Sequence, residues 1–244
     1  ACAGAAGPAL EGGVTRMGMM AGPGVIDRVE IDPQSGAIEW HTIGNQVPVG
    51  ICGSGLIDLA AQLFRAGMLD IRGRLVPERC GDCFETIREV AHFRVVPANE
   101  SANGEALMLS QVDIDSLVRS KAAMYTILET ITQHVGITLE QLQTFFVAGT
   151  FGSFIRPASA VTIGMLPDLP LSHYRTLGNS SLGGTTMVLQ SAACVDEIDH
   201  IRDTITYLEL NVNQDFMNRF SAAKFIPHTD RARFPSVGPS SPAG

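Results

Sequence analysis

The chain has 244 residues, of which 45% are hydrophobic, so it can bury the core of one large domain or of two small ones. Its formal net charge of −8 and its isoelectric point near 5.2 argue against a nucleic-acid binder, which needs a basic face. No run approaches the roughly 18 uninterrupted apolar residues of a membrane helix. Five cysteines in a chain of this size indicate reduced thiols in a cytoplasmic protein, not a disulfide framework.

The first part of the chain is punctuated by glycine. It opens abruptly inside the glycine- and alanine-rich residues 1–8, so we interpret it as part of a longer protein whose upstream half is missing. Two β-prone runs follow at 24–31 and 37–43, and the sequence Asp-Pro-Gln-Ser-Gly between them predicts a hairpin turn. The glycine-rich turn 50–55 then begins an amphipathic helix that ends near Ala66.

The middle of the chain is expected to be irregular until one long helix begins. Residues 70–110 are polar, with β-prone islands at 92–96 and 106–109. Asp113 is the expected N-cap of a helix that ends at Gly136, because apolar residues recur at helical spacing in between.

The last part of the chain alternates strands and helices through glycine-rich turns. Strands are expected at 144–148, 174–177 and 204–210, and helices after residue 184, at 196–202 and at 215–223. This alternation predicts an α/β fold. Residues 229–244 are expected to form a flexible tail, because their end is rich in proline, serine and glycine.

Three glycine turns are the first candidates for a binding site. Glycine lets a backbone approach a ligand closely, and a helix N-terminus presents unpaired N–H groups to phosphate. For any one turn a purely structural role is the better interpretation, but three together favour a nucleotide or another phosphate ligand, although none is a Walker A loop. The candidate residues at and near these turns are Gly50, Gly53, Ser54, Gly55, Asp58, Gly149, Thr150, Phe151, Gly152, Gly178 and Asn179.

A few charged and thiol side chains are further candidates. Lys121 lies on the apolar face of the long helix, where it either extends its ammonium into water or faces a cleft and touches the ribose or phosphate of a ligand. Asp58 and Asp168 follow closely on glycine segments, and Asp58 is equally well interpreted as a solvated acid in the first helical turn. Cys80 and Cys83 form a single CxxC without further metal ligands, so we expect two surface thiols in a loop and no metal site.

Five motifs in a fixed order carry a resemblance to a known family. They are Cys2-Ala-Gly-Ala-Ala-Gly-Pro-Ala-Leu-Glu-Gly12, Val49-Gly-Ile-Cys-Gly-Ser-Gly-Leu-Ile-Asp58, Asp113-Ile114 with Lys121-Ala-Ala, Val147-Ala-Gly-Thr-Phe-Gly-Ser-Phe154 with Ile163-Gly-Met-Leu-Pro-Asp168, and Leu177-Gly-Asn-Ser-Ser-Leu182. Over residues 1–228 the chain resembles the C-terminal, ATPase-type domain of the ATP-dependent reductive activators of corrinoid proteins. The resemblance implies a ribonuclease-H-like α/β domain of the actin, sugar-kinase and heat-shock-chaperone superfamily, incomplete at its N-terminus.

The resemblance also implies a function. In complete members an N-terminal [2Fe–2S] ferredoxin domain passes an electron to a cobalamin, and ATP with Mg²⁺ helps to return the cobalt from Co(II) to Co(I). This chain would be the part that binds ATP or ADP, with a corrinoid protein as its partner, and a homodimer remains open. Residues 147–154 are similar to the adenosine motif, and Lys121 matches a lysine that lines the nucleotide cleft.

Two departures from the family pattern limit what the chain can do by itself. Thr150 stands where the family usually has a second glycine. An Asp-x-Gly-Thr phosphate loop and the cysteines of a ferredoxin are absent from the sequence, so the chain alone is expected to be neither a reductase nor a competent ATPase, and no catalytic residue is assigned. The alternatives are a small-molecule kinase of the same superfamily and a non-catalytic docking or dimerisation module.

Overall fold

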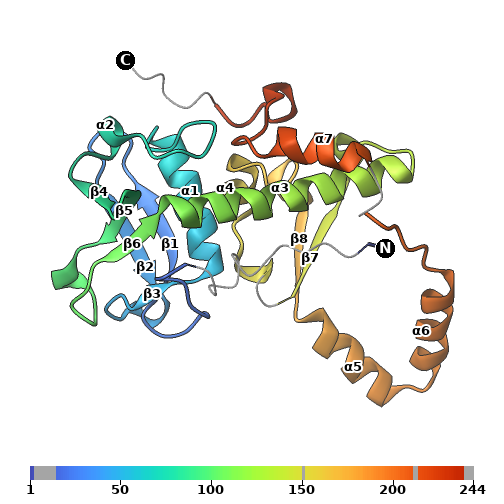
Figure 1. The fold of residues 1–244 in the computed structure, drawn as a ribbon. Coiled ribbons are helices and arrows are strands. Elements are labelled where there is room, and N and C mark those ends of the chain that lie inside the picture. Colours follow the sequence, from blue (N-terminus) through green and yellow to red (C-terminus); the bar gives the residue numbers. More distant parts are fainter. Residues whose placement is uncertain (3–14, 150–151, 211–213, 239–244) are drawn as a thin grey trace.

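The computed structural model describes residues 1–2, 15–149, 152–210 and 214–238, and its mixture of sheets and helices confirms the predicted α/β class (Figure 1). In the first sheet, β1 (Val25–Ile31) pairs antiparallel with β2 (Ile38–Thr42) and parallel with β3 (Gly50–Ile51). The predicted hairpin turn is confirmed, since the Asp32 carboxylate accepts two backbone N–H groups of the turn at 2.8 and 2.7 Å.

Helix α1 (Gly53–Arg65) packs against this sheet, as the apolar spacing predicts. Its side chains Leu59, Leu63 and Phe64 are completely buried and form the centre of the core. The helix ends where Gly67 takes a φ of +72°, and the next residue returns its N–H to the Leu63 carbonyl.

A second sheet occupies the region expected to be irregular. It has the order β4-β5-β6, all antiparallel, formed by β4 (Phe84–Ile87), β5 (Val90–Val96) and β6 (Leu107–Ser110), after the short α2 (Pro77–Cys80). The two predicted islands are β5 and β6, whereas β4 is a strand that the prediction missed. The β4–β5 turn gives no glycine signal, because Arg88 and Glu89 take the positive φ values of +49° and +66° themselves.

The long helix α3 (Gln111–His134) crosses the molecule, with β5 and β6 at one end and α7 (Gln214–Ala223) alongside the other (Figure 1). The predicted N-cap is wrong. Ser110 caps the helix, and Asp113 is the third helical residue, whose carboxylate accepts the Ser110 N–H at 2.9 Å in a capping box. The predicted end is confirmed, with Gly136 at a φ of +78° just beyond the helix.

The part of the chain after α3 contains a small parallel sheet. Strand β7 (Phe145–Ala148) pairs with β8 (Tyr174–Gly178) and, within the described residues, with no other strand. The short α4 (Pro157–Thr162) lies between them in sequence, and α5 (Ser180–Gln190) and α6 (Ala193–Thr204) extend away from the body as an arm (Figure 1).

The strand expected at 204–210 does not form. The β-branched residues there pair with no strand among the described residues, and the main chain instead exchanges hydrogen bonds with the first residue. The Leu208 N–H donates to the Ala1 carbonyl at 2.7 Å, and the Ala1 amino group donates to the Thr206 carbonyl. A strand needs a partner as well as propensity.

Residues 229–238, the first part of the expected tail, contact the body of the protein through individual side chains. Phe234 is 1% exposed and lies against the Tyr125 ring at 5.4 Å between centroids. Arg233 donates to Glu129 of α3 at 2.6 Å. The remaining expected tail, 239–244, lies outside the described residues. None of the helices in the described ranges is long and apolar enough to cross a membrane.

A glycine substitution tests how tightly the C-terminal segment packs. Gly164 follows α4 at a φ of +74°, and a Cβ there would lie 2.0 Å from the Pro227 carbonyl oxygen. Gly136 has a similar φ, +78°, but open space around it. Gly136→Ala should lower the free energy of unfolding by about 1–2 kcal/mol through strain alone, and Gly164→Ala by at least about 1 kcal/mol more. Urea unfolding measures both, and equal losses would contradict this packing.

Candidate functional site

The ends of the two parallel strands bring two predicted glycines together. Gly149 follows β7 and donates its N–H to the carbonyl of Gly178, the last residue of β8, at 2.8 Å. Both have positive φ, +98° and +64°, and among the described residues a Cβ on either would meet nothing within 4 Å. Within this part of the chain the backbone of the glycine pair therefore borders open space, and only glycine adopts these conformations without strain.

A helix begins directly after the glycine pair. Asn179 is the N-cap of α5, and its side-chain oxygen accepts the Leu182 N–H at 3.1 Å. The N–H groups of the first turn have no partner within a helix, and together with the helix dipole they favour an anion. Because the site also lies at the carboxyl ends of parallel strands, its position is the one that nucleotides prefer in α/β folds.

The loop from β7 to α4 turns back on the same glycine pair. Ser153 donates both its backbone N–H and its hydroxyl to the Gly149 carbonyl, at 3.1 and 2.9 Å. A Cβ on Gly152 would lie 2.6 Å from Val147, so this position requires glycine for space. Thr150 and Phe151, which were predicted in the same loop, lie outside the described residues.

The glycines of the turn 50–55 allow close packing within the protein, unlike the glycine pair, which borders open space. A Cβ on Gly50 would lie 2.7 Å from the Met17 carbonyl oxygen, and one on Gly55 would lie 2.5 Å from that of Ile26. Gly53 and Ser54, at the start of α1, are also buried. These glycines allow α1 to approach β1. Within the described residues no hydrogen bond joins this turn to the glycine pair, so the convergence of all three turns on one cleft stays a prediction.

The Asp58 carboxylate is buried and contacts groups from several elements, so its interpretation as a solvated acid is wrong. Its side chain is 1% exposed and accepts the Val29 N–H at 2.9 Å and the Ser159 hydroxyl at 2.5 Å. Arg156, which precedes α4, adds an ion pair at 3.2 Å. The carboxylate thereby joins β1, α1 and α4, and the protein itself supplies its partners.

Lys121 is also buried and does not extend into water. Its side chain is 1% exposed, and Nζ donates to the carbonyls of Phe225 and Pro227, the latter at 2.7 Å. Burial lowers its pKa well below the ordinary value, because the charged form loses its hydration. The amine connects α3 to the segment after α7.

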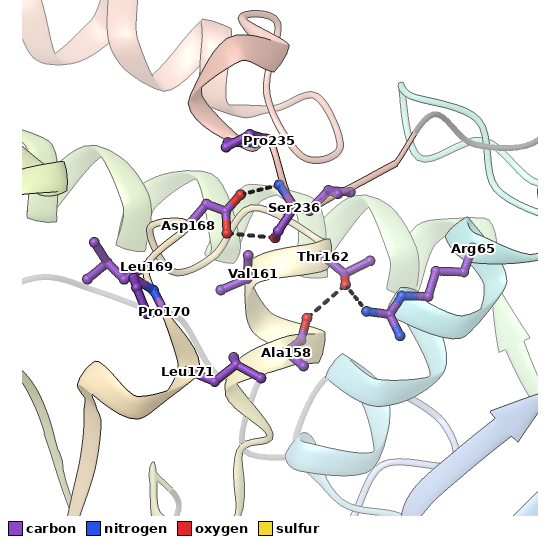
Figure 2. A pocket seen from close by; sticks show the side chains of 11 residues that line it. Arg65, Ala158, Val161, Thr162, Asp168, Leu169, Pro170, Leu171, Pro235 and Ser236 are labelled. Carbon is purple, nitrogen blue, oxygen red and sulfur yellow. Dashed lines mark hydrogen bonds between the residues drawn. The ribbon is translucent and has the colours of Figure 1, made fainter.

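A cavity of about 340 Å³ lies between α1, α4 and the C-terminal segment (Figure 2). Its polar groups engage one another. Arg65 donates to the Thr162 hydroxyl at 2.8 Å, and the Asp168 carboxylate accepts the N–H and the hydroxyl of Ser236 at 2.7 and 2.6 Å. The rest of the lining is largely apolar and includes Val161, Leu169, Pro170, Leu171, Pro235 and Val237.

A family model described as the C-terminal domain of RACo, the ASKHA domain, matches residues 1–238. The chain belongs to this family. The resemblance inferred from the five motifs is thus confirmed.

The similarity of the chain to individual proteins supports the same family assignment. The chain is 30% identical over 223 residues to the corrinoid activation enzyme RamQ of Eubacterium limosum, covering 88% of this chain and 37% of that protein. It is 23% identical over 238 residues to a Methanosarcina barkeri reductase of the Co(II) methylated amine-specific corrinoid protein, covering 88% and 40%. A solved reductive activator for corrinoid, iron–sulfur protein superposes with a TM-score of 0.91 at 40% identity, over 97% of this chain and 38% of that one. The chain thus spans less than half the length of these relatives.

The CxxC of this ASKHA domain is not a pair of surface thiols. Cys80 is 4% exposed, and burial raises its pKa to about 11, while Cys83 is half-buried and its pKa is raised by the same cause. Both thiols are protonated near neutral pH, which makes them poor nucleophiles. In the described part of the chain no three His, Cys, Asp or Glu side chains gather as a metal site would require.

Removing the Asp58 carboxylate should destabilise the ASKHA domain strongly. Asp58→Ala leaves the Val29 N–H and the Ser159 hydroxyl buried without an acceptor, so we expect a loss of about 2–5 kcal/mol in the free energy of unfolding. The control is Asp27→Ala on β1, which removes only an exposed contact with His41 and should cost less than about 1 kcal/mol. Denaturant unfolding measures the free energy of unfolding of both variants. A loss for Asp58→Ala no larger than that of the control would contradict a stabilising role of the buried carboxylate.

The buried amine should make stability depend on pH. The folded pKa of Lys121 lies below its unfolded value near 10.4, so between the two values the unfolded chain binds more protons. The free energy of unfolding should therefore rise with pH, by at most about 1.4 kcal/mol per unit, and Lys121→Met should remove this contribution. Unfolding at pH 7, 8 and 9 measures it, with the exposed Lys224→Met as control. A variant with the wild-type slope would contradict the assignment.

Proposed function

We propose that this chain is the nucleotide-binding part of an ATP-dependent reductive activator that returns corrinoid proteins from Co(II) to Co(I). The observation that carries the proposal is the open glycine pair, Gly149 and Gly178, at the start of α5. The relatives' names support the reaction, since one is a corrinoid activation enzyme and another a reductive activator. The single electron that reduces the cobalt would come from an iron–sulfur domain outside this chain.

The residues at the glycine pair suit a nucleotide. The N–H groups at the start of α5 are donors for phosphate oxygens, and the positive φ of both glycines leaves room for a ligand against the backbone. Gly152 and Asn179 shape the two sides of this opening, and Thr150 and Phe151 belong to the same loop. ATP would supply the free energy for an unfavourable electron transfer, and Mg²⁺ would be held by its phosphates and by residues outside this chain.

The remaining predicted residues support this site without touching the ligand. The turn with Gly50, Gly53, Ser54 and Gly55 sets α1 against β1, and Asp58 fixes α4, which follows the glycine loop. Lys121 is engaged with two carbonyls, so its contribution is to hold the C-terminal segment on α3.

A small-molecule kinase would need an acid free to activate a hydroxyl or carboxylate substrate. The two acids that the sequence singled out both have partners within the protein. The Asp58 carboxylate contacts three groups, and the Asp168 carboxylate accepts a hydrogen bond from the Ser236 hydroxyl. These contacts favour the activator over the kinase. The activator would have a corrinoid protein as its partner and would act in the cytoplasm.

The test is calorimetry with Mg-ATP and Mg-ADP on the full-length gene product. Gly178→Val places a branched side chain in the open space of the site and should weaken ATP binding at least about tenfold, or 1.4 kcal/mol. The control is Gly104→Val, which has a similar φ of +70° and is equally open, in the loop before β6.

The control should bind ATP like the wild type, because it carries the same backbone strain in another part of the fold. The 244-residue chain alone should bind weakly. If Gly178→Val binds ATP as well as Gly104→Val, the glycine pair is structural and the proposal is wrong.

A further inference from the structure

The cysteines of the CxxC sequence occupy the two ends of one tight turn. Cys80 is the last residue of α2, and Cys83 directly precedes β4. Between them Gly81 takes a φ of +52° and a ψ of −134°, close to the values of about +60° and −120° for the first central residue of a type II′ turn. The Cα atoms at the ends of such a turn lie less than about 7 Å apart, and a disulfide needs about 4.4–6.8 Å. The backbone therefore holds the two cysteines at a separation that a disulfide can bridge.

The contacts of Cys80 allow its sulfur to turn towards Cys83 at little cost. The Cys80 thiol donates to the Met68 carbonyl with the sulfur 3.6 Å from the oxygen, a weak hydrogen bond. The same carbonyl accepts the Val76 N–H at 2.9 Å, so it keeps a partner when the thiol leaves. Burial raises the pKa of Cys80 to about 11, and a negative charge on Cys83 contributes to this rise, so the two sulfur atoms already interact.

The two thiols differ in how easily a reagent reaches them. Cys80 is 4% exposed, whereas Cys83 is half-buried. Burial, Asp82 and Glu85 raise the pKa of Cys83, and the guanidinium of Arg94 opposes them. Arg94 is held beside this thiol, because it donates to the Asp82 carbonyl at 2.7 Å and to the Glu85 carboxylate at 2.6 Å. Cys83 is therefore the cysteine that meets an external reagent first, and Cys80 is the second thiol behind it.

We propose that Cys80 and Cys83 form a reversible dithiol–disulfide site that reacts with small-molecule disulfides such as oxidised glutathione. The Cys83 thiolate attacks one sulfur of the small disulfide, which forms a mixed disulfide and releases one thiolate. The Cys80 thiol then loses its proton to water, attacks the Cys83 sulfur and releases the second thiolate. The two protein thiols are thereby oxidised to one disulfide, and the small disulfide is reduced to two thiols.

The site is specific to this pair and separate from the glycine pair. Cys52 is buried, and its thiol donates to the Ile26 carbonyl, while Cys2 and Cys194 have no second cysteine near them in sequence. In the view of Figure 1, α2 and β4 lie on the other side of α1 from β7 and β8. The dithiol site therefore does not depend on the proposed nucleotide function.

Mass spectrometry of one tryptic peptide tests the proposal. Cleavage after Arg79 and Arg88 releases residues 80–88, which contain both cysteines of the pair and no other. The full-length gene product is equilibrated with mixtures of oxidised and reduced glutathione, quenched with acid and digested. The peptide should lose two hydrogen atoms and carry no glutathione. Its disulfide should be at least about tenfold more stable in the folded protein than in a synthetic peptide of residues 80–88, or about 30 mV, because the turn is already formed.

Two serine variants test the order of the steps, with circular dichroism as the check that each is folded. Cys80→Ser should stop at the mixed disulfide, so its peptide should gain one glutathione at Cys83. Cys83→Ser should leave the buried Cys80 unmodified. A wild-type peptide that keeps both thiols while Cys2 or Cys194 carries glutathione would overturn the proposal. A disulfide no more stable in the protein than in the synthetic peptide would also overturn it, because the fold would then contribute nothing to the pair.

Discussion

The buried carboxylate of Asp58 is the constraint on which the candidate site depends. A charge in the interior is costly unless it is paired and hydrogen-bonded, and here a β1 amide, a hydroxyl of α4 and the guanidinium before α4 all meet it. Arg156 and Ser159 follow the loop that contains Gly152. The contacts of Asp58 therefore help to fix the position of that loop relative to the first sheet.

The C-terminal segment is held by a second set of polar contacts, along α3. Lys121 binds two carbonyls of the segment, Glu129 binds Arg233, and the Phe234 ring lies against Tyr125. Across the cavity, Asp168 holds Ser236. The segment thus connects α3 to the region after α4, so the long helix and the site side of the molecule are parts of one packed body.

Local sequence signals predicted the local structure well. The Asp32 turn, the end of α1, and the strands that lead to Gly149 and Gly178 follow from patterns of a few residues. Such patterns also pointed to the glycine pair, since strand–glycine–helix junctions are readable from sequence. The β4–β5 turn was missed because Arg88 and Glu89 adopt the backbone conformation that normally signals glycine. The helix N-cap was placed three residues late because Ser110 and Asp113 share the capping.

Features that depend on distant residues could not be predicted. The partners of Asp58 on α4 lie about a hundred positions along the chain, and those of Lys121 likewise, so neither burial is visible in a local pattern. Residues 205–210 have strand propensity but pair with no described strand, and Phe234 packs against the rings of Tyr125 on α3 and of His228 in the preceding loop. Propensity describes what a segment can form, and the rest of the fold decides whether it does.

The burial of Lys121 limits which basic residue can occupy its position. An amine can lose its proton when it is enclosed, and it then needs only acceptors such as the two carbonyls that surround it. A guanidinium stays charged at any pH at which the protein folds, and it has five N–H donors to satisfy. Arginine, the usual conservative exchange for lysine on a protein surface, would bring into this site a permanent charge and donors without acceptors. At this position the two basic residues are therefore not equivalent.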